Sequence, residues 1–298
     1  MKALVISGGG CKGSFAGGIA EYLIKDCCNN YDIFVGCSTG SLLLPHLALK
    51  KIDKIKNIFT SVRQEDIFNI CPFRIKKTPS GISTKINHFN TVRSFLKGCV
   101  TFGESHNLRS LISKSILPEE LQEINDRNIK IILAVSNLSK DRVEYISAKD
   151  NNHKDFCDWA WASCNYIPFM SVFEKNGNQY ADGGFGGFIP IVQAINEGAT
   201  DIDVIVLEPP HTQAIYPPVT NPYALLLRTF HFMNQQNSAK DLVIGNLMCI
   251  NRKVNIHLYH TPEILTDNPL LFRPKQMTQW WKDGYEYAKS TEPIKFCN

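Results

Sequence analysis

The sequence predicts an α/β fold in which helices flank a mostly parallel sheet. Residues 2–7 are rich in Val, Ile and Leu, which is typical of a buried strand. Apolar residues then recur at helical spacing over 14–28, and a second short apolar strand follows over 32–36. Residues 41–49 are apolar almost all round, which indicates a buried helix. This strand–helix–strand–helix order is typical of parallel βαβ units with a right-handed crossover.

The rest of the chain continues the alternation of strands and helices. The Asn176-Gly177 pair marks a hairpin turn that leads into Asp182. Residues 50–107 carry a weaker pattern, which fits either a cap over the fold or a surface excursion with two small helices. Strands are expected over 130–137, 142–147, 170–174, 179–181, 202–207 and 254–259, and helices over 155–164, 223–251 and 275–289.

Composition indicates a packed globular protein without a strong charge bias. Of the 298 residues, 44% are hydrophobic and 20% are charged, and the net charge is +4. Such a balance suits an anionic membrane surface and is too weak to indicate nucleic-acid binding. No run of about 18 apolar residues occurs, so no transmembrane helix is expected. Because there is no repeat or clear linker, we expect one domain over 1–298, with its motifs in about 1–210 and residues 211–298 completing it.

Cysteine usage bears on the compartment. Ten cysteines occur without any C-x-x-C pair, which favours scattered buried thiols in a reducing compartment over a zinc site or a redox motif. The apolar stretch at the N-terminus is about five residues long, which is too short for a signal peptide. We therefore expect a cytoplasmic protein that contacts membranes only at their surface.

The first motif with chemical meaning is the G-x-S-x-G sequence over 36–40. It follows the second predicted strand and precedes the buried helix, which is the context of a nucleophile elbow. In such an elbow the serine lies on a strained strand-to-helix turn, and the glycines leave room for the sharp bend. Ser38 is therefore the candidate nucleophile, and Gly36 and Gly40 are the elbow glycines.

The second motif is a glycine-rich loop between the first strand and the first helix. It consists of Gly8, Gly9, Gly10, Cys11, Lys12 and Gly13. Its backbone N–H groups at a helix N-terminus, with the Lys12 cation nearby, are expected to form an oxyanion hole for Ser38. The same spacing occurs in dinucleotide-binding loops, which leaves a nucleotide-binding module as an alternative. That fingerprint needs an acidic residue at the end of the next strand, whereas Asp32 lies at its start.

The third motif is Asp182-Gly183-Gly184, which offers a carboxylate on a tight turn. Such a carboxylate can take the proton of a serine hydroxyl if the fold brings it next to Ser38. The alternative is a Ser-His-Asp triad, for which His257 and His260 at a strand end are the candidates. Against the triad, only one predicted strand precedes the elbow strand, whereas α/β-hydrolases commonly have several.

The three motifs, in this order, resemble those of the patatin-like phospholipase family. Members carry a G-G-G-x-[KR]-G loop near the N-terminus, a G-x-S-x-G elbow on the next strand, and an Asp-Gly-Gly or Asp-Gly-Ala motif much later. The segment over 161–168 and the proline at 190 also resemble the family pattern. The sequence departs from that pattern at 187–189, Gly-Phe-Ile, where the family often has an asparagine. The resemblance covers about residues 1–210.

The resemblance implies a three-layer α/β fold and a catalytic dyad of Ser38 and Asp182. Such a dyad hydrolyses carboxylic esters of lipids, as a phospholipase A or a lysophospholipase does, through a covalent acyl-enzyme on the serine. It implies no metal and no cofactor. The implied partners are a lipid substrate and, transiently, a membrane surface, with no nucleic acid.

Overall fold

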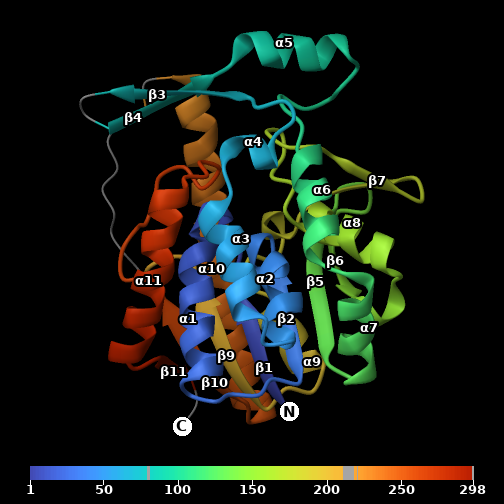
Figure 1. Cartoon of the computed structure of the whole chain (residues 1–298). Helices are drawn as coiled ribbons and strands as arrows, with labels where there is room; N and C mark the ends of the chain where they lie inside the picture. Colours follow the sequence, from blue (N-terminus) through green and yellow to red (C-terminus); the bar gives the residue numbers. More distant parts are fainter. Residues whose placement is uncertain (79–80, 211–217, 220, 297–298) are drawn as a thin grey trace.

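The fold is built on one nine-stranded sheet in the computed structural model, which describes residues 1–78, 81–210, 218–219 and 221–296. The strand order is β11-β10-β9-β1-β2-β5-β8-β7, and β6 pairs with β5 (Figure 1). The strands from β10 to β5 in this order run parallel, and antiparallel strands extend the sheet on both sides. A separate two-stranded sheet, β3-β4, lies at the top of the molecule in Figure 1.

The strands are short, as is typical of a twisted sheet between helices. Those of the large sheet are β1 (Lys2–Ile6), β2 (Ile33–Cys37), β5 (Lys130–Asn137), β6 (Arg142–Ser147), β7 (Phe173–Lys175), β8 (Asn178–Asp182), β9 (Asp201–Val206), β10 (Asn255–His260) and β11 (Ile294–Phe296). The small sheet consists of β3 (Phe73–Thr78) and β4 (Gly81–Ile86).

Helices connect the strands. They are α1 (Gly13–Lys25), α2 (Thr39–Ala48), α3 (Ile52–Ser61), α4 (Gln64–Ile67), α5 (His88–Leu96), α6 (His106–Ser115), α7 (Pro118–Asp126), α8 (His153–Ser163), α9 (Ile191–Asn196), α10 (Pro222–Arg252) and α11 (Pro274–Ser290). Short 3-10 turns are η1 (Gly10–Lys12), η2 (Ala148–Asp150) and η3 (Gly183–Phe185).

The helices cover both faces of the sheet and give the fold three layers. Successive side chains of a strand point to opposite faces, so β1 contributes to two cores. Leu4 and Ile6 pack in a cluster with side chains of α1, α2 and α11, whereas Ala3 and Val5 pack in a second cluster with α9 and the end of α10. The predicted α/β class, with a mostly parallel central sheet between helices, is confirmed.

Each strand and helix predicted outside 50–107 has its counterpart, and four of the described elements that lie wholly or mostly outside that segment were not predicted: α6, α7, α9 and β11. Residues 50–107 hold more than two small helices, because they contain α3, α4, the β3-β4 hairpin, α5 and the start of α6. Among the described cysteines, eight are free thiols, of which Cys27 and Cys28 are exposed rather than buried. Cys249 is disulfide-bonded, so the expectation of thiols throughout is wrong at this position.

Candidate active site

Ser38 and Asp182 come together because two strands meet end to end along β5. The last residue of β2, Cys37, pairs with Ala134 of β5, and the last residue of β8, Asp182, pairs with the next residue, Val135. β6 pairs with β5 over 132–137, so β2 and β8 must share the other edge of β5. β2 runs parallel to β5 and β8 antiparallel, so their carboxyl ends point at each other. The G-x-S-x-G and Asp-Gly-Gly motifs are therefore neighbours in space.

Ser38 lies on a strained turn between β2 and α2. Its φ of 52° and ψ of −125° fall in a region that side-chain-bearing residues rarely adopt, which is the geometry of a nucleophile elbow. Gly40 makes room for this turn, because a Cβ there would lie 2.4 Å from the carbonyl oxygen of Ile6. The amide of Ser38 donates a hydrogen bond to Oγ of Ser163 on α8, at 3.0 Å. Ser163 thus holds the main chain of the elbow in place. No sequence motif indicated this role.

Asp182 is buried directly beside the serine hydroxyl. Oγ of Ser38 donates to Oδ2 of Asp182 at 2.6 Å, and the amide of Gly184 donates to Oδ1 at 2.8 Å. The amide of Asp182 donates to the carbonyl of Asn165 at 2.9 Å, which fixes the main chain. Burial raises the pKa of the Asp182 carboxyl from 3.8 to about 6, although the hydrogen bonds from Ser38 and Gly184 act in the opposite direction. Such a carboxylate is ionised at neutral pH and has an increased affinity for a proton.

The glycine-rich loop lies next to Ser38, and its amides divide into two groups. Those of Gly8 and Cys11 already donate to the carbonyls of Phe188, at 3.3 Å, and Pro269, at 2.8 Å. Those of Gly9 and Gly10 have no acceptor among the described residues. Gly10 has φ of 57°, and a Cβ there would lie 2.2 Å from the carbonyl oxygen of Pro269. Two adjacent glycine amides at the pocket thus stay available for a bound anion.

Lys12 is neither on the surface nor directed at the serine. Its side chain is 6% exposed, and Nζ donates to the carbonyl of Leu207 at 2.7 Å and to Oε1 of Glu208 at 2.6 Å. Its amide donates to the carbonyl of Gly9. The buried pair ties the glycine-rich loop to the end of β9, and its charge is balanced by Glu208.

The segment over 187–189, where the sequence departs from the family pattern, has no asparagine to make hydrogen bonds. Its hydrogen bonds are made by its own main chain. The amide of Ile189 donates at 2.8 Å to Oδ2 of Asp241, which lies on α10. Burial raises the pKa of Asp241 to about 6. Phe188 lines the pocket, and its carbonyl accepts the amide of Gly8. The segment therefore links α10 to the glycine-rich loop.

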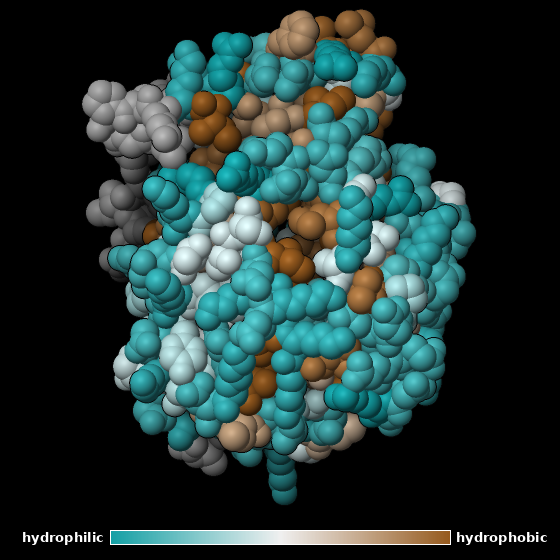
Figure 2. Space-filling model, viewed as in Figure 1, coloured by the Kyte–Doolittle hydropathy of each residue, from teal (hydrophilic) through white to brown (hydrophobic). Residues whose placement is uncertain are grey.

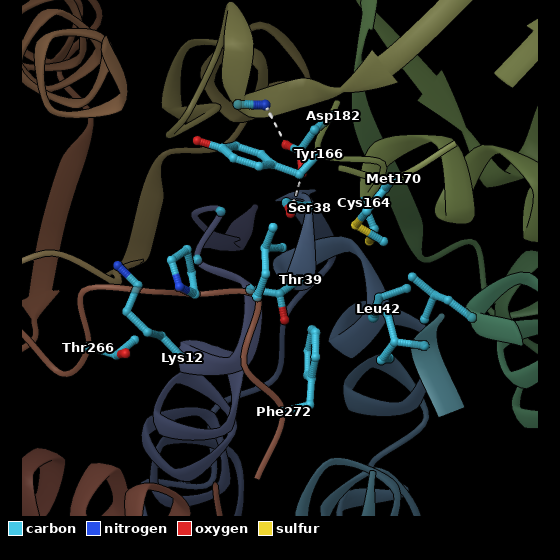
Figure 3. Close-up of a pocket in the computed structure, with 18 of the residues that line it drawn as sticks. Lys12, Ser38, Thr39, Leu42, Cys164, Tyr166, Met170, Asp182, Thr266 and Phe272 are labelled. Carbon is cyan, nitrogen blue, oxygen red and sulfur yellow. Dashed lines mark hydrogen bonds between the residues drawn. The ribbon is translucent and has the colours of Figure 1, made fainter. Parts of the chain in front are cut away.

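A deep pocket leads to Ser38 and Asp182, and its two ends differ in polarity. Figure 3 shows Lys12 and Thr266 on one side of Ser38, and Leu42 on the other, with Phe272 between. The pocket holds about 1120 Å³ of space, its open mouth included. Figure 2 shows a hollow lined by hydrophobic side chains, between α3 and α6 and below α4. The apolar wall includes Leu42, Ile58, Val62, Ile67, Leu108, Leu111, Phe272 and Met277, and the polar end includes Lys12, Glu208, His231, Asn234, Thr266 and Asp267.

The two histidines proposed for a triad lie elsewhere. Nδ1 of His257 is 3.2 Å from Oδ1 of Asp203, and Nδ1 of His260 is 3.0 Å from the carbonyl oxygen of Glu208. Neither residue is among those that line the pocket. His231 of α10 does line it and had no sequence signal, and burial lowers the pKa of its imidazole.

In the described ranges, no cluster of three or more His, Cys, Asp or Glu side chains is arranged to hold a metal ion. Likewise, none of the helices that the structure describes combines the length and the apolar character needed to cross a membrane.

The comparisons with known proteins agree with the motifs. The model of the patatin-like phospholipase family matches residues 4–195, which is more than half of the chain. The chain therefore belongs to the patatin-like phospholipase family, a family of lipid hydrolases. Among solved structures it is similar to VipD from Legionella pneumophila, with a TM-score of 0.49 and 15% identity, over 99% of this chain and 68% of that chain. None of the curated proteins matches it at a significant level.

Proposed function

We propose that the protein is a lipid acyl hydrolase of the phospholipase A or lysophospholipase type that works through a dyad of Ser38 and Asp182. The observation that carries the proposal is the 2.6 Å hydrogen bond from Oγ of Ser38 to Oδ2 of Asp182 at the bottom of a largely apolar pocket. A serine hydroxyl is a weak nucleophile that needs an adjacent base, and this carboxylate is the group in contact with it.

The reaction runs in two halves. In the first, Oγ of Ser38 attacks the ester carbonyl as its proton passes to Asp182, and the returned proton leaves with the alcohol. In the second, water loses a proton to Asp182 and attacks the acyl carbon; Asp182 returns this proton to Oγ of Ser38 as the bond to the acyl group breaks, which releases the fatty acid and restores the serine. A pKa near 6 supports both transfers, since the carboxylate accepts a proton at neutral pH and gives it back readily.

The amides of Gly9 and Gly10 are proposed to stabilise the oxyanion. They are the loop amides without an acceptor among the described residues, whereas those of Gly8 and Cys11 are already used. Lys12 does not contact the oxyanion in this proposal. Its ion pair with Glu208 holds the glycine-rich loop in position. Of the six loop residues expected at the oxyanion hole, Gly9 and Gly10 are the proposed donors. The other four residues hold the loop in its conformation.

The shape of the pocket supports a lipid substrate. The apolar wall between α2, α3 and α6 accepts an acyl chain, and the polar end near Lys12 and Thr266 accepts the hydrated glycerol side of the ester. A substrate with such chains resides in a membrane or micelle, so the protein must contact that surface transiently.

The test is hydrolysis of defined lipids by the full chain. Wild-type protein is incubated with a panel of diacyl phospholipids and lysophospholipids, and the products are identified by mass spectrometry. We expect free fatty acid, with lysophospholipid from diacyl substrates if the enzyme acts as a phospholipase A. Ser38→Ala is expected to abolish release, and Ser61→Ala, which removes an exposed hydroxyl on α3, is expected to leave it unchanged.

A fluorophosphonate probe identifies the nucleophile independently. Such a probe reacts with activated serines, and peptide mapping is expected to find it on Ser38. Fatty-acid release that persists in Ser38→Ala, or a label on another serine of active protein, contradicts the dyad. Wild-type protein that releases no acid from any lipid contradicts the proposed activity.

A further inference from the structure

Helix α5 is amphipathic, but its polar side faces the protein and its apolar side faces outward. Nδ2 of Asn90 donates to the carbonyl of Cys71 at 2.8 Å, and Oγ of Ser94, which is fully buried, donates to the carbonyl of Thr101 at 2.9 Å. Asn87 caps the helix by accepting the amide of Asn90. The helix is thus held by hydrogen bonds on its inner side, where a helix of a water-surrounded protein normally buries its apolar residues.

The outer side of α5 is apolar. Phe89 is 74% exposed and Leu96 is 83% exposed, and Val92 lies between them at 56%. Val100, just after the helix, is 73% exposed, and Phe95 is 49% exposed although its ring contacts Phe102. Figure 2 shows hydrophobic side chains at the top of the molecule, where Figure 1 places α5. Clustered exposed apolar side chains of this size are characteristic of an interaction surface.

The segment around α5 is exclusively basic. Residues 68–103 contain six Lys and Arg and no Asp or Glu, so the remainder of the chain, by difference from +4, carries a net charge of −2. Arg74, Lys85, Arg93 and Lys97 are all exposed. These charges favour an anionic partner. They disfavour a second copy of the same surface, because pairing two copies would bring like charges together.

The same segment adjoins the pocket. It runs from the end of α4 to the start of α6, and Ile67 of α4 and Leu108 of α6 both line the pocket. Inside the segment, the ring of Phe73 packs on Phe169, which is followed by the pocket residue Met170. Figure 1 places α5 above α4 and α6, so its exposed apolar side lies beyond the helices next to which the pocket opens.

We infer that the outer side of α5, with Phe89, Val92, Leu96 and Val100, inserts into the surface of an anionic phospholipid membrane, and that the surrounding lysines and arginines bind its head groups. Apolar side chains on one side of a helix and cations beside them are the features of interfacial membrane binding. The inference rests on the proposed function for its choice of a lipid surface, which supplies the substrate of the adjoining pocket.

The test measures binding of the full chain to vesicles that it cannot hydrolyse. Vesicles of dialkyl-ether phosphatidylcholine, with and without about 30% dialkyl-ether phosphatidylglycerol, are sedimented with the protein. We expect wild-type protein to bind the anionic vesicles, and the double variant Phe89→Ser, Leu96→Ser to bind about 10- to 100-fold more weakly, because two large apolar side chains no longer leave water. Arg93→Gln with Lys97→Gln should weaken binding to anionic vesicles about 10-fold and reduce its salt dependence.

The matched control is the double variant Leu247→Ser, Ile250→Ser. These side chains are 55% and 62% exposed and lie near the end of α10. That helix leads into the start of β10, at the amino ends of the parallel strands, whereas Ser38 follows the carboxyl end of β2. The control variant should bind as wild type does. Melting temperatures and hydrolysis of p-nitrophenyl butyrate, an ester that needs no membrane, should be unchanged in all variants.

Two results overturn the inference. One is vesicle binding that is absent in wild type or equal in the α5 and α10 variants. The other is a wild-type dimer that the α5 variant converts to a monomer, which would make this surface an interface between two copies. Neither depends on catalysis, whereas failure of the proposed function appears separately, as wild-type protein that hydrolyses no ester.

Discussion

Replacing Asp182 by Asn is expected to inactivate the enzyme and at the same time to stabilise the fold above pH 6. The carboxylate is 3% exposed, and its ionised form is disfavoured by burial. The amide keeps the shape of the side chain. Its oxygen can still accept the amide of Gly184, and its NH₂ can donate to Oγ of Ser38, whose hydroxyl can accept as well as donate. One hydrogen bond between the two side chains is thus kept, and the amide of Gly184 keeps its acceptor.

The size of the effect follows from the pKa. Folding raises the pKa of Asp182 from 3.8 to about 6, which is roughly 2 units. Below pH 4 the group is protonated in both the folded and unfolded states, and no stability is lost. As the pH rises from about 4 through 6, the unfolded chain releases the proton first and stability falls, reaching a loss of about 3 kcal/mol above pH 6. The Asn variant does not have this loss.

The assay compares melting temperatures of wild type and Asp182→Asn between pH 4 and pH 8. The variant should gain about 5 °C over wild type at pH 8, and the gain should shrink toward pH 4. Its hydrolysis should fall on the order of 10²- to 10⁴-fold, as expected for loss of a general base. Wild-type kcat/KM should rise with pH through about 6. Asp126→Asn, an exposed carboxylate on α7, should show neither effect.

A stability difference that does not change with pH, or a folded Asp182→Asn protein that remains active, would contradict this prediction. Loss of activity together with loss of stability at pH 8 would also count against it. That outcome would mean that the ionised carboxylate is a structural group and that its removal disrupts the site.

Four further substitutions test the surroundings of the proposed dyad. Ser163→Ala leaves the amide of Ser38 without its acceptor and should cost about 1–3 kcal/mol of stability and most of the activity; Ser61→Ala, measured alongside, should cost neither. Gly10→Ala requires an unfavourable φ and meets the carbonyl of Pro269, so folded protein should be less stable by at least about 1–3 kcal/mol, and a normal melting temperature would disprove the close approach. His257→Ala and His260→Ala should keep their activity per folded molecule, and an inactive folded variant of either would instead support a Ser-His-Asp triad.

The first forty residues were predictable because their signals are local. An apolar strand, a glycine-rich turn and an amphipathic helix follow one another, and the elbow at Ser38 lies where strand and helix meet. Each of these features is determined by residues a few positions apart. The order of elements, and with it the α/β class, could therefore be read before any tertiary contact was known.

The pairing of Ser38 with Asp182 could not be read in this way. It depends on where β2 ends on β5 and on β8 reaching the same edge of β5, and strand register leaves no local mark in the sequence. The loop amides that remain available are also determined at long range, because the carbonyls of Phe188 and Pro269 accept the amides of Gly8 and Cys11. The family resemblance supplied the pairing, but it did not distinguish Gly9 and Gly10 from their neighbours.

The segment over 50–107 was hard to interpret for a different reason. Helix prediction assumes that apolar residues face the core, and α5 places them outward while Asn90 and Ser94 face inward. The apolar residues recur at helical spacing, but they face away from the protein instead of toward its core. The hydrogen bonds of Asn90 and Ser94 with the rest of the protein distinguish α5 from a surface helix with a weak apolar pattern.

The dependence of the glycine-rich loop on Pro269 has a consequence for the order of events during synthesis. The loop, Ser38 and Asp182 are all made before residue 190, yet the carbonyl that holds the amide of Cys11 belongs to a residue made about 80 positions later. β1 likewise pairs with β9, which is made much later. Gly18 of α1 packs against the backbone of Trp281, which is made later still. A growing chain therefore carries both members of the proposed dyad well before it can hold the proposed oxyanion donors in place. Lipid hydrolysis should begin only when the last third of the polypeptide has folded onto the first.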